Sequence, residues 1–89
     1  MADILIIDDD RSQLRLVSRW LEHEGWSVHT CDRGSDGLDA LKDMVPEAVV
    51  LDLYLNGENG LELLRTILER HPNLPVVMLT SESKVDVVV

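Results

Sequence analysis

Three short apolar runs divide the chain, at residues 4–7, 48–51 and 76–79. Each is a continuous stretch of mostly branched side chains, which is typical of strands buried on both faces of a parallel sheet. A further strand is expected at residues 27–31, after the break at Gly25. The apolar runs lead directly into polar residues: Asp8 follows the first, Asp52 the second and Thr80 the third.

Between these strands, apolar residues recur at helical spacing. Leu14, Val17 and Leu21 predict a helix from residue 11 to about residue 24, with Gly25 as its stop. A second helix is predicted by Leu38, Leu41 and Val45, and Pro46 ends it. A third is predicted by apolar residues on one helical face, before Pro72 and Pro75; they are Leu61, Leu64, Ile67 and Leu68.

The alternation of strands and helices predicts the fold class. The order β-α-β-α-β-α-β favours an α/β fold with a doubly wound parallel sheet, in one domain over residues 1–89. Ser83 and Asp86 resemble a capping box for a further helix, although residues 85–89 are mainly valine, a weak helix former.

Composition narrows the expected environment and partners. Eight basic and seventeen acidic side chains give a net charge of -9, which repels nucleic-acid phosphates and anionic lipids, so neither nucleic acid nor membrane is an expected partner. A single cysteine, Cys31, excludes an internal disulfide, and the acidic N-terminus does not resemble a signal segment. The apolar runs are far shorter than the roughly 20 residues of a membrane-spanning helix. We therefore expect a cytoplasmic protein.

Carboxylates at the strand ends predict a metal site. In open parallel sheets, ligands bind beyond the carboxyl ends of the strands, where the strand order reverses. If the order begins 2-1-3-4, Asp8 and Asp9 face Asp52, and Thr80 lies beside them on the fourth strand. Carboxylates this close raise one another's pKa, so the site requires a cation or holds a proton. Oxygen ligands favour a hard ion, and Mg²⁺ is expected where a phosphoryl group adds oxygens.

A purely structural role competes at each of these positions. Aspartate after a strand often only caps the next helix, and this is the role expected of Asp10. The same role is the alternative for Asp8, Asp9 and Asp52. Thr80 has the alternative of a simple polar strand end.

Three segments together resemble a known family. They are "ILIIDDD" at residues 4–10, "VVLDLYLNGENG" at 49–60 and "VVMLTSES" at 76–83. Each is weak alone, but in this order and at these intervals they resemble the receiver domain of bacterial two-component response regulators, the CheY-like superfamily. The resemblance covers the whole chain. It implies a flavodoxin-like doubly wound sheet of order 2-1-3-4 whose fifth strand is missing, so that residues 1–89 form a C-terminally truncated receiver domain.

The resemblance also assigns roles to the strand-end residues. It implies that Asp52 is the phosphoacceptor and Thr80 the switch hydroxyl. The Mg²⁺ ligands would be Asp9, Asp52 and the backbone carbonyl of Tyr54, with Asp8 mostly through water. The phosphoryl donor would be a sensor histidine kinase or a phosphotransfer protein. The domain would then be a self-phosphorylating signalling module, not a turnover enzyme, and would switch a fused output domain that is absent from this sequence.

Two departures from the family pattern have consequences. Asn56 stands where the family usually has proline, which affects the stiffness of that loop. The family's fifth-strand lysine and switching aromatic are absent, and Lys84 is a poor substitute for the lysine. Without a fifth strand, the strand at residues 76–79 becomes an exposed edge, which predicts a homodimer or an element-swapped oligomer through that edge.

Two alternative functions remain open from the sequence. Asp8 and Asp10 form an Asp-x-Asp after a buried strand, which is similar to haloacid-dehalogenase-type phosphatases, but this hypothesis leaves Asp52 without a role. The second alternative is a degenerate receiver that acts only as a docking module. Phosphoryl transfer to Asp52 itself distinguishes both from the first hypothesis.

Overall fold

The computed structural model describes residues 2–55, 57–79 and 85–88. The elements are β1 (Asp3–Ile7), α1 (Arg11–His23), β2 (Ser27–Cys31), α2 (Gly34–Asp43), β3 (Ala48–Asp52), β4 (Tyr54–Leu55), β5 (Glu58–Asn59), α3 (Gly60–Arg70), β6 (Val76–Leu79) and β7 (Val85–Val88). The expected strands and the three helices between them are confirmed. The short strands β4 and β5 and the strand β7 were not predicted.

The sheet has the order β2-β1-β3-β6-β7. Its first four strands are parallel, so the predicted α/β class and the 2-1-3-4 order are confirmed. Ile7 of β1 pairs with Leu51 of β3, and Asp52 pairs with Leu79 of β6. This register brings the carboxyl ends of β1, β3 and β6 together at one edge of the sheet.

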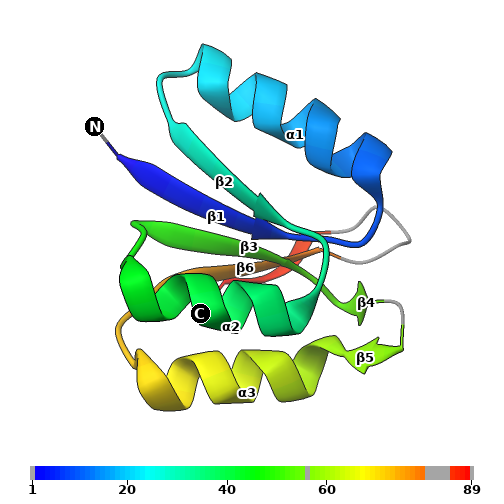
Figure 1. The fold of residues 1–89 in the computed structure, drawn as a ribbon, viewed down its shortest axis with the longest axis vertical. Helices are drawn as coiled ribbons and strands as arrows, with labels where there is room; N and C mark the ends of the chain where they lie inside the picture. Colours follow the sequence, from blue (N-terminus) through cyan, green and yellow to red (C-terminus); the bar gives the residue numbers. More distant parts are fainter. Residues whose placement is uncertain (1, 56, 80–84, 89) are drawn as a thin grey trace.

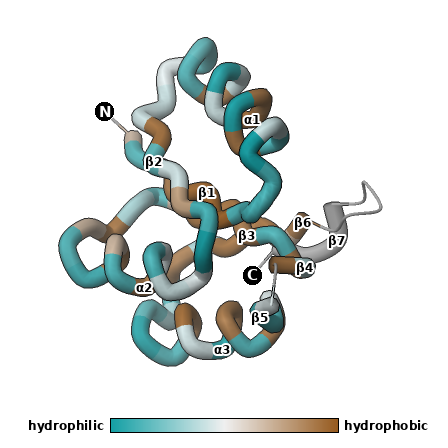
Figure 2. Tube along the Cα trace, turned by 45° about the vertical axis from the view of Figure 1, so that its right-hand side comes forward, coloured by the Kyte–Doolittle hydropathy of each residue, from teal (hydrophilic) through white to brown (hydrophobic). Residues whose placement is uncertain are grey.

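Helices cover both faces of the sheet (Figure 1). The apolar face of α1 packs on one side, where Leu14 meets Ile4, Ile6 and Val50. The helices α2 and α3 cover the other side, where Leu41 and Ile67 join Leu5 and Leu51 in the larger core. Hydrophobic residues accordingly concentrate along the central strands in Figure 2. Burial of β1 and β3 from both sides explains why their sequences do not alternate.

Two of the apolar positions that marked the predicted helices lie outside the core. Val45 follows the end of α2 and is 73% exposed, because the helix stops at Asp43 before the chain turns into β3. Leu61 is 59% exposed, whereas its neighbour Leu63 is 8% exposed and belongs to the core. The actual inward face of α3 therefore contains Leu63 and Ile67, rather than a face that begins at Leu61.

The predicted helix after β6 is also wrong within the described residues. Val85–Val88 forms β7, which pairs antiparallel with β6 through Val77 and Val88 and through Met78 and Val87. β-branched valine favours strands, and here this preference outweighs the capping pattern of Ser83 and Asp86. Because β7 covers the outer side of β6, the exposed edge expected at residues 76–79 is absent, and with it the stated basis for a dimer or swapped oligomer through that edge.

Candidate functional site

Three aspartates converge at the carboxyl ends of β1 and β3. Asp8 and Asp9 follow β1, and Asp52 is the last residue of the adjacent strand β3. One carboxylate oxygen from each lies within 4.8 Å of the others. The grouping expected from the strand order is therefore present in the structure.

Asp8 is the most deeply placed member of the group, with 2% of its surface exposed. Its backbone N–H donates to the carbonyl of Cys31 on β2 at 3.1 Å, and its Oδ1 accepts a hydrogen bond from the N–H of Asp10 at 2.9 Å. The pKa of Asp8 is raised to about 6. Burial is the largest cause, the charge and hydrogen bond of Asp52 and the charge of Asp9 add to it, and the hydrogen bond from the Asp10 N–H acts in the opposite direction. The metal-free site therefore holds a proton on Asp8 below about pH 6.

Asp52 is held where β3 leaves the sheet, and 9% of its surface is exposed. Its Oδ1 accepts a hydrogen bond from the N–H of Tyr54 at 3.2 Å. The next residue, Leu53, donates its N–H to the carbonyl of Leu79 at 2.8 Å, which fixes the chain beside β6. The side chain of Tyr54 is exposed, so only its backbone takes part in this corner.

Asp9 forms the outer wall of the group. It is half-buried and lies in a polar depression that it shares with Asp32, Arg33, Ser35 and Glu58. The acidic group is therefore open to solvent on the side of the loop before α2.

Asp10 takes no part in the group. Its Oδ1 accepts hydrogen bonds from the N–H groups of Ser12 at 3.0 Å and Gln13 at 3.2 Å, which caps α1. The expected capping role is confirmed, and the Asp-x-Asp arrangement of a phosphatase is not formed. Thr80, the predicted switch hydroxyl, and Lys84 lie outside the described residues.

The donor set fits a hard divalent cation. Three carboxylates share one small space, where burial and the charges of Asp52 and Asp9 raise the pKa of Asp8. Hard cations such as Mg²⁺ and Ca²⁺ bind to carboxylate and carbonyl oxygens. Asp8, Asp9 and Asp52 offer such oxygens, and the backbone of Tyr54 lies next to Asp52.

The segment after Asp52 contains a feature that the sequence argument missed. Tyr54 pairs with Asn59 and Leu55 with Glu58, forming the short hairpin of β4 and β5. The Glu58 carboxylate accepts a hydrogen bond from the N–H of Gly34 at 2.8 Å, across to the start of α2. The sequence shows Glu58 only as an acidic residue in a turn, and its spacing does not indicate that it contacts Gly34, 24 residues earlier.

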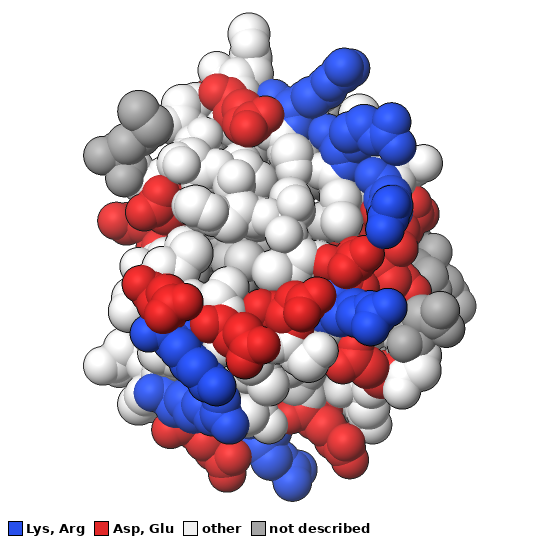
Figure 3. All heavy atoms as spheres, viewed as in Figure 1, with Lys and Arg blue, Asp and Glu red and all other residues white. Residues whose placement is uncertain are grey.

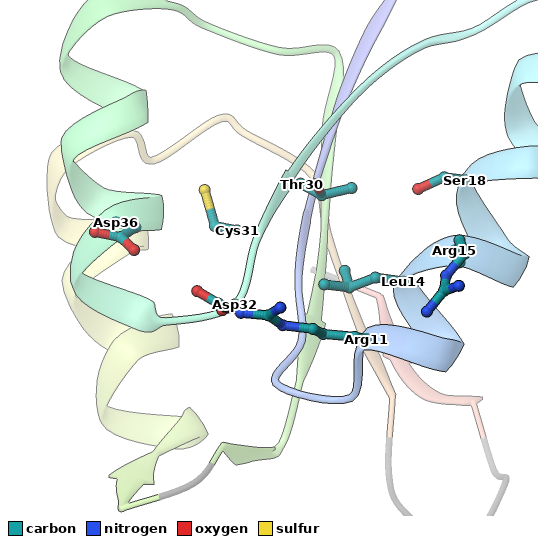
Figure 4. A pocket seen from close by; sticks show the side chains of 8 residues that line it. All are labelled: Arg11, Leu14, Arg15, Ser18, Thr30, Cys31, Asp32 and Asp36. Carbon is teal, nitrogen blue, oxygen red and sulfur yellow. Dashed lines mark hydrogen bonds and ion pairs between the residues drawn. The ribbon is translucent and has the colours of Figure 1, made fainter.

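A separate hollow beside β2 offers no comparable chemistry (Figure 4). It lies between α1 and α2, and the ion pair of Arg11 with Asp32, at 3.3 Å, links the start of α1 to the end of β2. The thiol in this hollow belongs to Cys31, and burial, together with the charges of Asp36 and Asp32, raises its pKa. A protonated thiol is a weak nucleophile, so the three aspartates, and not Cys31, form the candidate functional site.

Charge is distributed unevenly around the molecule. In the orientation of Figure 1, one group of basic side chains lies over α1, which contains Arg11, Arg15 and Arg19, another lies in the lower part of this face, and acidic side chains cross the middle (Figure 3). The start of α1 follows directly on the acidic group. The strong overall negative charge is thus locally offset beside the site that would receive an anionic group.

Comparison with known proteins identifies the family. The model of the response regulator receiver domain matches residues 4–89. The chain belongs to the response regulator receiver domain family. This membership agrees with the parallel sheet order and with the acidic group at the ends of β1 and β3.

Individual relatives support the same conclusion. The DNA-binding transcriptional regulator NtrC of Klebsiella pneumoniae is 39% identical over 94% of this chain and 18% of its own length. The receiver domain of NtrX from Brucella abortus is 40% identical, with a TM-score of 0.84 over 86% of this chain and 66% of that one. The response regulator protein TrrA from Thermotoga maritima, in complex with Mg²⁺-BeF, is 27% identical, with a TM-score of 0.86 over 91% and 70%.

The chain corresponds to one part of its curated relatives. It covers 36% of the probable transcriptional regulatory protein TcrX of Mycobacterium tuberculosis and 18% of NtrC. The shared part is the receiver domain, a signalling module. Within the described residues, no helix combines the length and apolar character needed to cross a membrane.

Proposed function

We propose that Asp52 accepts a phosphoryl group and that Asp8, Asp9, Asp52 and the backbone carbonyl of Tyr54 hold the Mg²⁺ that this transfer needs. The observation that carries the proposal is the convergence of three carboxylates at the ends of two adjacent strands. Family membership supports it, since the matched model is that of response regulator receivers. The Mg²⁺-BeF complex of the related protein TrrA gives further support.

The chemistry follows from the position of Asp52. One carboxylate oxygen, Oδ1, accepts the N–H of Tyr54, which leaves the other oxygen for attack on phosphorus. The new bond is an acyl phosphate, and the bond from phosphorus to the donor's imidazole nitrogen breaks as the imidazole leaves. Bound Mg²⁺ supplies the positive charge that lets two anionic groups approach and offsets the charge of the phosphoryl oxygens.

The other aspartates prepare the site for this step. A bound cation would compete with the proton for Asp8, whose pKa is raised, and Asp9 faces the open side from which the donor approaches. Thr80 follows Leu79, the residue paired with Asp52, and we assign it the switch hydroxyl that contacts the added oxygens. The chain thus modifies itself once per signal and does not turn over a substrate.

The partners follow from the same role. The donor is a phosphohistidine on a sensor histidine kinase or a phosphotransfer protein, and the response passes to an output region of the whole protein. NtrC is named a DNA-binding transcriptional regulator, which supports a transcriptional output. This assignment places the whole protein in the cytoplasm, with DNA contact made by the output region and not by the acidic receiver.

Beryllofluoride binding tests the site directly. Fluorine NMR of the chain with Mg²⁺, beryllium and fluoride is expected to show a bound species that disappears when Mg²⁺ is removed. Asp52→Ala is expected to abolish this species, because the acceptor oxygen is lost. Asp43→Ala, which removes an exposed carboxylate at the end of α2, is the matched control and is expected to bind as the parent does. Equal binding by Asp52→Ala and the parent would exclude Asp52 as the acceptor.

A further inference from the structure

The N-terminus of α2 is capped from a distance. The helix begins at Gly34, and the residue before it, Arg33, makes no capping hydrogen bond with its side chain. The Glu58 carboxylate accepts the N–H of Gly34 at 2.8 Å instead. A carboxylate is well suited to this position, because the first N–H groups of a helix are unpaired within it and carry partial positive charge.

The space at Gly34 is shaped for this contact. A Cβ atom at Gly34 would lie 2.8 Å from Oε2 of Glu58 and 2.9 Å from a methyl group of Leu63. A side chain at this position would therefore push the carboxylate away from the helix. The absence of a side chain at residue 34 allows Glu58 to sit against the backbone.

Glu58 belongs to the segment that carries the site. This segment starts at Asp52, whose Oδ1 accepts the Tyr54 N–H, and ends where Asn59 caps α3 through the N–H groups of Leu61 and Glu62. Within it, Leu55 pairs with Glu58 and Tyr54 with Asn59. The bond to Gly34 is a lateral tie from this hairpin to the opposite wall of the depression that contains Asp9.

We propose that Glu58 is a positioning residue that fixes the Tyr54 segment relative to Asp9 and Asp52 and so sets the affinity of the site for Mg²⁺. This inference rests on the proposed function, because it assumes that the ion binds among these carboxylates. Outer partners of metal ligands change affinity by about 10-fold to 100-fold when they are removed. The tie acts through the hairpin and not through contact with the ion.

Three variants separate this role from a general effect of charge. Glu58→Ala removes the tie. Glu58→Gln keeps an oxygen that can accept the Gly34 N–H but removes the charge. Asp36→Ala removes a carboxylate from the first turn of the same helix and is the control for net charge. Mg²⁺ affinity is measured by calorimetry, and hydrogen exchange at the Gly34 amide reports the tie independently of the metal.

The expected pattern is specific. Glu58→Ala loses protection at the Gly34 amide and binds Mg²⁺ about 10-fold more weakly, whereas Glu58→Gln retains most of both. Asp36→Ala binds within about twofold of the parent, since the charge of an exposed side chain is largely screened by salt. If the melting temperature of Glu58→Ala without Mg²⁺ equals that of the parent, the loss of Mg²⁺ affinity is not caused by unfolding. If the melting temperature is lower, the Mg²⁺ titration is repeated at a temperature well below the unfolding transition, where the variant is folded.

Distinct outcomes overturn the inference and the proposed function. If Glu58→Ala binds Mg²⁺ within twofold of the parent while Asp52→Ala does not bind, the site is correct and the role of Glu58 is wrong. If Asp52→Ala binds Mg²⁺ as the parent does, the site itself is wrong and the inference falls with it. Weakening of equal size in Glu58→Ala and Asp36→Ala would reduce the effect to net charge and overturn the positioning role.

Discussion

The ionised form of Asp8 lowers the stability of the folded protein when no cation is present. It is almost fully buried, and burial is the largest cause of the rise of its pKa to about 6, followed on the raising side by Asp52 and Asp9. In the unfolded chain the pKa of this carboxyl lies near its ordinary value of 3.8. Above pH 6 the folded protein therefore holds a carboxylate in a place that favours the protonated form.

The sign of the pH dependence follows from this difference. Between about pH 4 and pH 6 the folded state binds more protons at Asp8 than the unfolded state does, so this group lowers the free energy of unfolding as pH rises through that window. Above pH 6 the loss from this group is complete and constant. Protons compete with Mg²⁺ for Asp8, so we also expect Mg²⁺ affinity to fall as pH drops below 6.

Asp8→Asn tests this account at the residue scale. Without Mg²⁺ at pH 7, we expect the variant to be more stable than the parent by about 1 to 2 kcal/mol, because it removes the buried charge and its amide oxygen can still accept the Asp10 N–H. In saturating Mg²⁺ the order should reverse, since the parent gains binding energy that the variant loses.

Urea denaturation with and without Mg²⁺ measures both effects. Asp39→Asn is the control, because it removes an exposed charge whose ion pair with Lys42 contributes little. If Asp8→Asn is less stable than the parent in the absence of Mg²⁺ at pH 7, the charge of Asp8 does not destabilise the folded state.

At the scale of elements, the strand ends divide their aspartates between two tasks. Asp8 and Asp9 turn toward Asp52, while Asp10 caps α1 through Ser12 and Gln13. The sequence alone could make this division, because Asp10 directly precedes the helical pattern and the other two follow the strand. It could not locate Glu58 at α2, since that contact depends on how the hairpin of β4 and β5 lies across the loop before α2.

The cap at Asp10 has a measurable contribution of its own. Asp10→Ala is expected to lower the free energy of unfolding by about 1 kcal/mol, because two N–H groups of α1 lose their acceptor. Asp10→Asn retains the side-chain oxygen and should stay close to the parent. Mg²⁺ affinity, measured in the same samples by calorimetry, should be unchanged in both. A large loss of Mg²⁺ binding in Asp10→Asn would place this carboxylate in the metal site and contradict the division.

The inward face of α3 offers a second test at this scale. Ile67 is fully buried against the sheet, so Ile67→Ala should cost about 2 to 5 kcal/mol. Leu61→Ala, in the first turn of the same helix, should cost far less because Leu61 is exposed. Thermal or urea unfolding of the two variants measures the difference. Similar losses for both would mean that the face begins at Leu61, as the leucine spacing alone suggests.

For the whole molecule, the sequence predicted the arrangement wherever local pattern and topology agree. Continuous apolar runs identify β1, β3 and β6, and the rule for parallel sheets then places Asp8, Asp9 and Asp52 together. The outer part of the sheet was not predicted, because Ser83 and Asp86 resemble a helix cap whereas residues 85–88 are mainly β-branched valine, and the strand forms by pairing with the free side of β6. Whether this segment pairs with β6 depends on the assembled sheet, which the pattern of residues 85–88 alone does not indicate.

Incubation with acetyl phosphate and Mg²⁺, followed by mass spectrometry of the intact chain and its peptides, tests the central claim most directly. We expect the parent to gain one phosphoryl group, located on Asp52, and to gain none when Mg²⁺ is removed. Asp52→Asn should remain unmodified, while Asp43→Asn should be modified like the parent. A phosphoryl group found on another residue, or equal modification of Asp52→Asn, would contradict the account.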